Sequence, residues 1–291
     1  MPKRINALLL SLALFFSLCS CAEPKQAPRA AEHELVITVF SLGKADAILI
    51  ECGGSSMLID CGEKEHGALL LRALAARGIS RLDVLQITHF DKDHVGGAAA
   101  ILGETEVGTI LCPAYEGSRT EYFSFLRAAA ACPRVIAVSE PLTMPLGTAG
   151  FTVYPAEDPA AFDARADGFD NEMSLVTMLE SGGERFLFCG DAENGRIRQM
   201  LASGVDWSCA WIKLPHHGRY GKQLAKLLKK SGARIAVMTV SRDAPVEEKT
   251  LALLAELGIE SYDTLTGDVV TTLDDGAIRI EAGTENGEAG A

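Results

Sequence analysis

Basic side chains are in short supply in this sequence. Its 291 residues contain 27 Lys and Arg against 39 Asp and Glu, which gives a formal net charge of −12. Proteins that bind duplex nucleic acid normally present a basic face to the phosphates. Tight binding to nucleic acid would therefore need a local basic patch within an unfavourable overall field.

Cys-x-x-Cys pairs are absent, although the chain has eight cysteines. Their absence argues against a zinc site built from paired thiolates. If Cys19 and Cys21 belong to a processed leader, the six remaining cysteines permit disulfides in an oxidising compartment. Several of the six lie in apolar segments, such as Cys189 after the run 186–188. Buried free thiols fit that pattern at least as well as disulfides do.

An internal linker-like break is also missing. Residues 21–32 are polar and contain two prolines, which predicts a tether, and residues 284–291 lack any core pattern, which predicts a flexible tail. The composition is that of a globular protein, with 48% hydrophobic and 23% charged residues. We therefore expect residues 33–283 to fold as one domain.

The first residues have the features of a targeting segment. Two basic residues precede an almost wholly apolar run at 7–18, and small residues follow. Leu-Cys-Ser-Cys at 18–21 resembles a bacterial lipobox. This predicts a lipoprotein signal peptide over 1–20, lipidation of Cys21, and a protein anchored on the extracytoplasmic face of a bacterial membrane. A simple secretory signal and an uncleaved anchor are the alternatives.

Strand and helix patterns alternate along the predicted domain. Helical periodicity is clearest at 68–77, 95–102, 120–131 and 191–202. Apolar runs in both halves, with helices between them, favour the α/β class and a four-layer αββα sandwich. We expect strands at 34–40, 46–52, 56–61, 82–88, 109–112, 134–138, 151–155, 174–180, 185–189, 211–214, 234–240, 261–262, 268–273 and 277–280.

Four potential metal ligands lie within six residues of one another, namely His89, Asp91, Asp93 and His94. The predicted strand 82–88 leads directly into them and two glycines follow. Imidazole and carboxylate groups are common ligands of divalent metals. Loops at strand ends are where rigid scaffolds hold functional groups. The pattern predicts a metal site.

Other polar groups also lie at the ends of predicted strands. These are Asp60, the pair Asp170 and Asn171, Asp191, and the pair His216 and His217. His-x-Asp-x-Asp-His-x-Gly-Gly at 89–97, Gly-Asp at 190–191 and His-Gly at 217–218 together resemble the metallo-β-lactamase-fold hydrolase superfamily. Segments 39–50, 58–62 and 171–176 strengthen the similarity to its ComEC-like competence group, which extends over residues 34–281.

The resemblance implies one or two divalent metal ions, Zn²⁺ or Mn²⁺, in a sandwich of the metallo-β-lactamase type. One ion would be held by His89, Asp91 and Asp191. The second would be held by Asp93, His94, Asp191 and His217, so that Asp191 bridges the two.

Further roles follow from the same resemblance. Asp60 would orient a ligand through a hydrogen bond, although it could also simply bond backbone amides. Asp93 and His216 are the candidate catalytic residues, His216 through contact with a phosphate oxygen or proton delivery. Asn171 and Arg219 are the candidate substrate contacts, because a forked guanidinium suits a phosphate.

The chain departs from the superfamily pattern at several places. Arg219 stands where a serine often follows His-His-Gly, Ala244-Pro245 stands where a His-Pro pair is common, and two further departures concern the metal ligands. Asp91 stands where a histidine is usual, and no histidine occurs from 95 to 215, so a further ligand is missing. Asp170 is the candidate substitute, although a turn cap explains it as well. Oxygen-rich ligand sets suit Mn²⁺ or Mg²⁺ better than imidazole-rich sets do.

The predicted function is hydrolysis of a phosphodiester, with DNA among the possible substrates, outside the cytoplasm. A cell-wall or small-molecule phosphoester or lactone is the alternative substrate. A binding lipoprotein with a degenerate metal site is the alternative that is not an enzyme.

Overall fold

The computed structural model of the chain describes residues 33–283. The predicted signal peptide, tether and tail, together with Cys21, lie outside these residues. All six cysteines in the described range are free thiols, and five of them are buried. No helix within 33–283 is long and apolar enough to cross a membrane.

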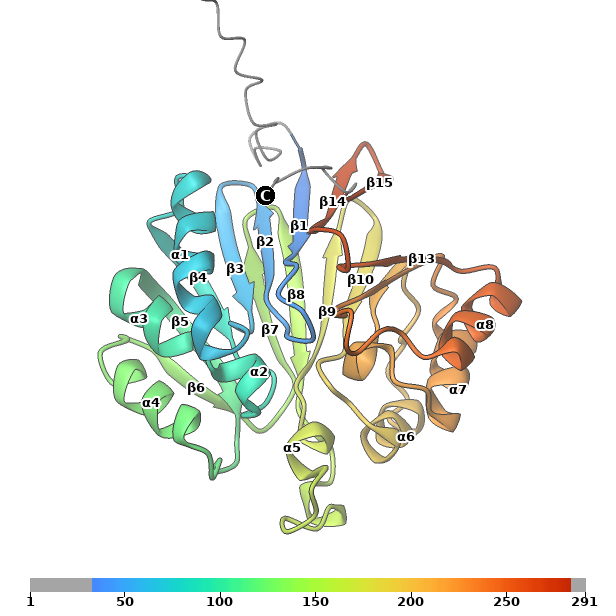
Figure 1. The fold of residues 1–291 in the computed structure, drawn as a ribbon, viewed down its shortest axis with the longest axis horizontal. Helices are drawn as coiled ribbons and strands as arrows, with labels where there is room; N and C mark the ends of the chain where they lie inside the picture. The colour runs from blue at the N-terminus through green and yellow to red at the C-terminus, as the bar shows by residue number, and fades with distance from the viewer. Residues whose placement is uncertain (1–32, 284–291) are drawn as a thin grey trace, which may run out of the picture.

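Two stacked β-sheets form the centre of the molecule (Figure 1). The first has eight strands in the order β15-β14-β1-β2-β3-β4-β5-β6, and the second has seven in the order β13-β12-β11-β10-β9-β8-β7. Side chains such as Ile50, Phe151 and Phe188 form the core between them. The strands of the first sheet are β1 (Leu35–Val39), β2 (Ile48–Cys52), β3 (Ser55–Ile59), β4 (Arg81–Gln86), β5 (Glu106–Pro113), β6 (Val135–Val138), β14 (Val269–Asp274) and β15 (Ala277–Ala282). Those of the second are β7 (Leu142–Leu146), β8 (Ala149–Tyr154), β9 (Val176–Ser181), β10 (Glu184–Phe188), β11 (Trp211–Lys213), β12 (Ile235–Met238) and β13 (Glu260–Asp263).

Helices cover the outer face of each sheet and complete the four layers (Figure 1). The first sheet packs on helices through Leu70, Ile101 and Phe125, and the second through Leu227 and Leu254. The first group of helices is α1 (Gly67–Ala76), α3 (Ala98–Glu104) and α4 (Thr120–Ala129), and the second is α6 (Asn194–Ala202), α7 (Lys222–Ser231) and α8 (Glu248–Leu257). The predicted αββα sandwich is confirmed.

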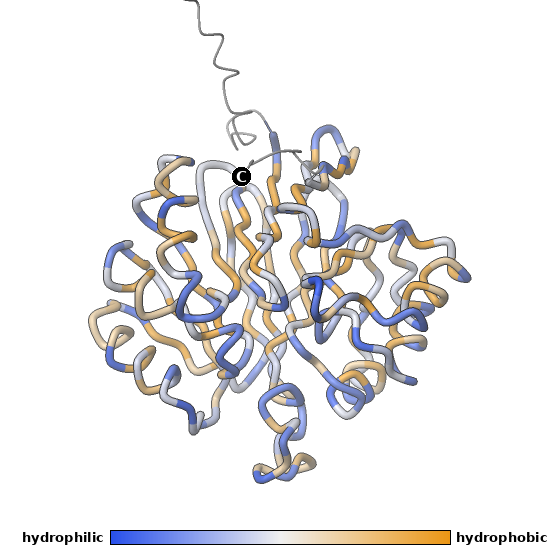
Figure 2. The backbone as a smooth tube through the Cα atoms, in the orientation of Figure 1, coloured by the Kyte–Doolittle hydropathy of each residue, from blue (hydrophilic) through white to orange (hydrophobic). Residues whose placement is uncertain are grey.

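Burial on both faces explains why the central strands read as continuous apolar runs. Every residue of β2 is buried, although its neighbours β1 and β3 are antiparallel to it. Figure 2 shows the same distribution, with hydrophobic residues along the central strands and hydrophilic residues mainly at the periphery. The short helices α2 (Lys92–Val95) and α5 (Phe169–Glu172) lie near one end of the sandwich (Figure 1).

Three local predictions need correction. The edge strand β7 was not expected, because Pro145 and a half-exposed pattern obscure it. The strand expected from residue 46 begins at Ile48. The helix expected at 95–102 is divided into α2 and α3, because residues 96 and 97 pack against the loop after β3. A Cβ atom on Gly97 would lie 2.3 Å from the carbonyl oxygen of Cys61.

Candidate metal centre

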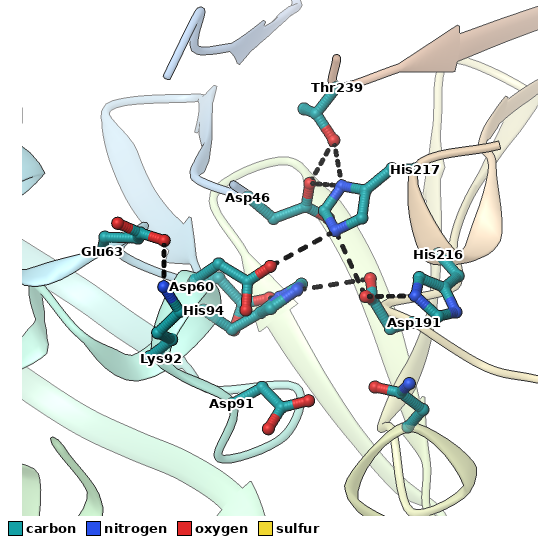
Figure 3. Close-up of polar contacts among 12 residues, drawn as sticks. Asp46, Asp60, Glu63, Asp91, Lys92, His94, Asp191, His216, His217 and Thr239 are labelled. Carbon is teal, nitrogen blue, oxygen red and sulfur yellow. Dashed lines mark hydrogen bonds and ion pairs between the residues drawn. The ribbon is translucent and has the colours of Figure 1, made fainter. Parts of the chain in front are cut away.

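The ligand-type residues lie on loops that follow strands of both sheets. His89 comes after β4, and His94 lies in α2, whose N-cap is Asp91. Asp191 comes after β10, and His217 lies in the 3₁₀ turn Pro215–Gly218 after β11. The two sheets thus place residues more than 120 positions apart at one site (Figure 3).

Backbone contacts fix these loops against one another. The amide of Leu175 donates to the carbonyl of Thr88 at 2.9 Å, and the amide of Asp191 donates to Ser174 Oγ at 3.1 Å. Gly190 has φ +51°, and a Cβ atom there would lie 3.0 Å from Thr88 Cβ. A side chain at residue 190 would therefore push the Asp191 loop away from the first sheet.

Strained backbone is concentrated at this site. Within residues 33–283, four non-glycine residues have positive φ, and three of them are Asp60, His216 and His217. Such conformations cost roughly 1–3 kcal/mol each and persist where the surrounding structure enforces them. The strained residues therefore lie on the loops that orient these side chains toward the site.

Four groups of three ligand-type residues converge in the site, and Asp46 belongs to two of them, with Asp191 and His217 and with Asp60 and His94. The other two groups consist of the predicted ligands. His89, His94 and Asp191 form one group, and Asp93, His94 and His217 form the other, each with its ligand atoms within 4.8 Å of one another. Asp191 Oδ1 lies 3.3 Å from His94 Nε2, and Asp191 Oδ2 lies 3.2 Å from His217 Nε2. The Asp191 carboxylate thus faces two imidazoles, one with each oxygen (Figure 3).

Hydrogen bonds at Nδ1 set the tautomer of His89 and His94. His94 Nδ1 lies 2.8 Å from the carboxylate of Asp60, to which it donates. The hydroxyl of Thr88 donates to Asp60 at 2.6 Å, so it accepts from His89 Nδ1 at 3.0 Å. In their neutral forms both imidazoles therefore carry the proton on Nδ1, which leaves the Nε2 lone pair free.

A hydrogen bond from the second sheet likewise fixes Nδ1 of His217. The hydroxyl of Thr239 donates to Asp46 Oδ1 at 2.5 Å and accepts from His217 Nδ1 at 2.7 Å. Hydrogen bonds of this kind to the far nitrogen orient metal-ligating histidines and raise their basicity.

Four buried polar atoms at the centre have no hydrogen-bond partner. They are Nε2 of His89, His94 and His217, and Oδ1 of Asp191. A buried polar group without a partner costs about 1–3 kcal/mol. Three imidazole nitrogens and a carboxylate oxygen are a ligand set that suits Zn²⁺, Mn²⁺ or Fe²⁺. The residues present therefore fit a divalent cation.

Charge within the site also favours a cation. Burial opposes charge on His94 and His217, yet carboxylates outweigh it: Asp191 and Asp60 raise the pKa of His94, and Asp191 and Asp46 raise that of His217 to about 10. Burial lowers the pKa of His89 to about 3. Protons on His94 and His217 thus supply positive charge that a metal ion would replace.

A buried ion pair beneath the site was not foreseen. Lys213 in β11 is fully buried, and its Nζ donates to Asp46 Oδ2 at 2.7 Å. The backbone of Asp46 donates to the carbonyl of Asp93 and accepts from the amide of Gly62. The pair therefore links the two sheets and holds the Asp93 loop and His217 together. The sequence does contain a sign of this ion pair, because the apolar runs 45–50 and 211–214 each include one charged residue.

The structure places Asp91 and Asp170 outside the convergent groups. Asp91 Oδ1 forms an ion pair with Arg119 Nε at 2.8 Å, while its Oδ2 lies 3.7 Å from His89 Nε2. Asp170 Oδ1 accepts a hydrogen bond from the hydroxyl of Tyr115 at 2.5 Å. That hydroxyl accepts in turn from the amide of Phe90 at 3.0 Å, so Asp170 also stabilises the loop after His89.

The remaining predicted residues border the site around Glu193. His216 Nδ1 lies 3.1 Å from Glu193 Oε1, and His216 Nε2 lies 3.8 Å from Asp191 Oδ2. Asn171 Nδ2 donates to the same oxygen of Glu193 at 3.2 Å. Arg219 Nη1 lies 3.4 Å from it, and the Arg219 side chain is 62% exposed. His216 thus faces the centre, while Arg219 remains accessible to a substrate.

Comparison with known proteins agrees with this geometry. The model of the family described as the metallo-beta-lactamase superfamily matches residues 41–151, which include the cluster at 89–94. Over this segment the chain is similar to the metallo-β-lactamase superfamily. It is 26% identical over 230 residues to ComE operon protein 3 of Bacillus subtilis (strain 168), a match covering 71% of this chain and 28% of that protein. It is 33% identical over 92 residues to competence protein ComA of Neisseria gonorrhoeae, covering 30% of this chain and 13% of that one.

Solved structures support the fold of this metallo-β-lactamase-type protein. The metallo-beta-lactamase fold protein YhfI from Bacillus subtilis superposes with a TM-score of 0.54 and 14% identity over 81% of this chain and 98% of its own. CmlA, a diiron β-hydroxylase from Streptomyces venezuelae, superposes with a TM-score of 0.53 and 15% identity over 85% of this chain and 55% of its own. The competence proteins confirm the predicted ComEC-like resemblance, although the chain spans less than a third of either.

Proposed function

We propose that this protein is a metal-dependent phosphodiester hydrolase that acts outside the cytoplasm. The observation that carries the proposal is the set of partnerless Nε2 atoms of His89, His94 and His217 around the Asp191 carboxylate. A cavity of about 260 Å³ adjoins this set and brings Lys44 and Arg219 beside His217. Cations next to a metal centre suit an anionic ester.

The chain's own groups supply binding and orientation. A bound divalent cation would lower the pKa of water and neutralise charge that develops on the ester oxygens. His94 and His217 would hold it at Nε2, with Asp191 between them, while Asp60 and Thr239 keep the imidazoles in the required tautomer. Arg219 would contact a non-bridging phosphate oxygen, and His216, held by Glu193, would face the leaving group.

Occupancy by two ions is part of the proposal. Asp93, His94, Asp191 and His217 would bind one ion through mixed nitrogen and oxygen ligands. His89, Asp91 and Asp191 would bind the other, with Asp91 using Oδ2, which faces His89, while Arg119 pairs with Oδ1. Zn²⁺ and Mn²⁺ fit these ligand types. Asp170 could join the second ion only if it gave up its bond to Tyr115.

The names of the curated relatives support DNA among the possible substrates. Both are competence proteins, but the matched segment is 28% of one and 13% of the other. The acidic net charge keeps a smaller phosphoester as a second substrate class.

Hydrolysis of bis-p-nitrophenyl phosphate by the purified full chain, after metal analysis and reloading with Mn²⁺, Zn²⁺ or Mg²⁺, tests the enzymatic proposal. We expect turnover with at least one ion and its loss in His94→Ala. Tight metal binding without cleavage of this ester or of DNA under any condition would instead identify a metal-binding lipoprotein.

Membrane attachment through Cys21 is tested separately. A Cys21→Ala variant expressed in a bacterial host should leave the membrane fraction, whereas the parent chain should stay in it. A variant that remains membrane-bound would contradict the lipid anchor and favour an uncleaved apolar segment.

A further inference from the structure

Three cavities follow one another from the metal centre, and each shares lining residues with the next. The first, of about 260 Å³, includes Lys44, His217 and Arg219. The second, of about 150 Å³, shares His216 and Arg219 with the first and extends along α6 to Tyr220. The two cavities therefore adjoin at His216 and Arg219, and a ligand at the metal centre would pass these side chains to reach the second cavity.

The third cavity continues this series away from the centre. It measures about 460 Å³ and shares Asn194, Tyr220 and Gly221 with the second. Its charged lining residues are Arg198 and Lys222, both of which are exposed. We call the three cavities together the cationic groove.

The charge of this groove is opposite to that of the chain. Its lining contains four cations and two acids, whereas the whole chain has 27 Lys and Arg against 39 Asp and Glu. One of the two acids, Glu193, is paired with one of the four cations, Arg219, which leaves three cations against Glu247. The groove is therefore the local basic patch that an acidic protein would need to attract a polyanion.

An exposed aromatic ring lies midway along the groove. Tyr220 is 39% exposed and is the only Phe, Tyr or Trp among the lining residues. The ammonium of Lys249 lies 5.9 Å from the centre of the Tyr220 ring. An exposed ring between cations is an arrangement on which a nucleic-acid base can stack.

The floor of the groove is fixed by contacts between two helices. Asn194, the first residue of α6, accepts a hydrogen bond from the amide of Gln223 near the start of α7, at 3.2 Å. A Cβ atom on Gly221 would lie 2.9 Å from Asn194 Oδ1, so the chain passes close to α6 here. A preformed floor reduces the ordering cost of binding an extended ligand.

We propose that the cationic groove binds a single strand of nucleic acid and leads it to the metal centre. Lys44, Arg219, Arg198 and Lys222 contact successive phosphates, and Tyr220 stacks on a base. This inference rests on the proposed phosphodiesterase function, because it assigns the substrate of the same site. A small diester such as bis-p-nitrophenyl phosphate would reach only the first cavity.

Fluorescence anisotropy on the metal-loaded full chain tests the groove without requiring turnover. The probe is a labelled single-stranded oligonucleotide with phosphorothioate linkages, which keep the charge. We compare Arg198→Gln/Lys222→Gln with Arg72→Gln/Arg127→Gln, which removes two exposed cations from α1 and α4 on the other sheet. The groove variant should reduce the slope of log affinity against log salt by about 1.4, at about 0.7 per phosphate contact. The control variant should leave this slope and the hydrolysis of the small diester unchanged.

Base stacking is tested with Tyr220→Ala, Tyr220→Phe and an abasic oligonucleotide. Tyr220→Ala should weaken binding of the normal strand about five- to a hundredfold, whereas Tyr220→Phe should retain it. The abasic strand should bind the parent and Tyr220→Ala equally.

If the two double variants reduced the salt slope of binding equally, the proposal that the cationic groove binds the strand would be wrong. An abasic strand that binds the parent as tightly as the normal strand would overturn the assignment to nucleic acid and favour a polyphosphate-type chain. Failure of the parent protein to cleave bis-p-nitrophenyl phosphate with any metal counts against the proposed function alone, since strand binding is measured separately.

Discussion

Two sides of the candidate metal centre are held in different ways. On the buried side, formed by His94, Asp191 and His217, the side chains are at most 4% exposed and both histidines are fixed at Nδ1. On the open side, formed by Asp91 and Asp170, Asp91 is 18% exposed and is paired with Arg119. On the buried side, Nε2 of both histidines already faces the Asp191 carboxylate, at 3.3 Å from His94 and 3.2 Å from His217.

This difference indicates an order of metal binding. An ion entering the buried side meets preorganised ligands and takes the place of protons on the two histidines. An ion entering the open side meets the positive charge of Arg119, which already pairs with Oδ1 of Asp91. We therefore expect tight binding of the first ion on the buried side and weaker binding of the second on the open side.

The largest effect should come from removing the carboxylate between the two histidines. Asp191→Asn should abolish both metal binding and ester hydrolysis, because this residue belongs to both ligand sets. Asp91→Asn should reduce the metal content from two ions to one. Inductively coupled plasma mass spectrometry on dialysed protein gives both values, and two ions retained by Asp191→Asn would reverse the assignment.

Breaking the buried ion pair should destabilise the fold strongly. Lys213→Met leaves the Asp46 carboxylate buried without its cation and should cost about 3–5 kcal/mol of unfolding free energy. Burial alone would raise the pKa of Asp46, but the charges of Lys213 and His217 outweigh burial and lower this pKa. Urea denaturation measures the loss, and the double variant Lys213→Met/Asp46→Asn should recover part of it. No recovery in the double variant would mean that the lysine acts through packing rather than charge.

Metal affinity on the buried side should rise steeply with pH. The pKa values of His94 and His217 are raised, the latter to about 10, so both carry protons at pH 7 that a metal ion must expel. The dissociation constant of the first ion should fall by at least about tenfold per pH unit between pH 6 and 8. Competition titration with a chelator measures it. A pH-independent constant would show that these histidines do not bind the ion.

The stability of the metal-free protein should fall as the pH rises, whereas the metal affinity should increase. A raised pKa contributes stability that is fully present below the unfolded value of 6.5 and is lost as pH rises towards 10. Metal-free protein should thus lose stability from pH 7 to 10, while the loaded protein should not. Thermal unfolding of both forms across this range checks the sign.

Removing the partner of a ligand should have a moderate effect. Asp60→Asn keeps the size of the side chain but weakens the hold on His94 Nδ1, and should lower metal affinity about 10- to 100-fold. A Thr88→Val control removes the hydroxyl that links Asp60 to His89. It should affect the ion held by His89 more than the ion held by His217.

The smallest change in stability is expected on the open side. Arg119 is 49% exposed, so Arg119→Gln should change the unfolding free energy by less than about 1 kcal/mol. The same substitution frees Asp91 and should strengthen binding of the second ion. Weaker binding of that ion would show that Arg119 assists the open side rather than competing with the metal.

Sequence patterns sufficed for the fold and for the residues at strand ends. Apolar runs precede His89, Asp191 and His216, and such runs require strands in buried sheets. Neighbouring parallel strands bring their carboxyl ends together. The sequence patterns did not reveal that Asp46 and Lys213 are partners. The two residues are 167 positions apart, and only the stacking of the two sheets brings them together. Arg119 was missed because exposed arginines on loops carry no pattern that distinguishes an ion pair with a ligand.

We expect the buried side to bind a cation through histidine Nε2 atoms. Anomalous diffraction from crystals of the Mn²⁺-loaded protein, recorded at the manganese absorption edge, tests this expectation most directly. The strongest peak should lie in contact with Nε2 of His94 and His217 and with the Asp191 carboxylate. A strongest peak at Asp91 and Asp170, or no peak while those Nε2 atoms bind water, would contradict it.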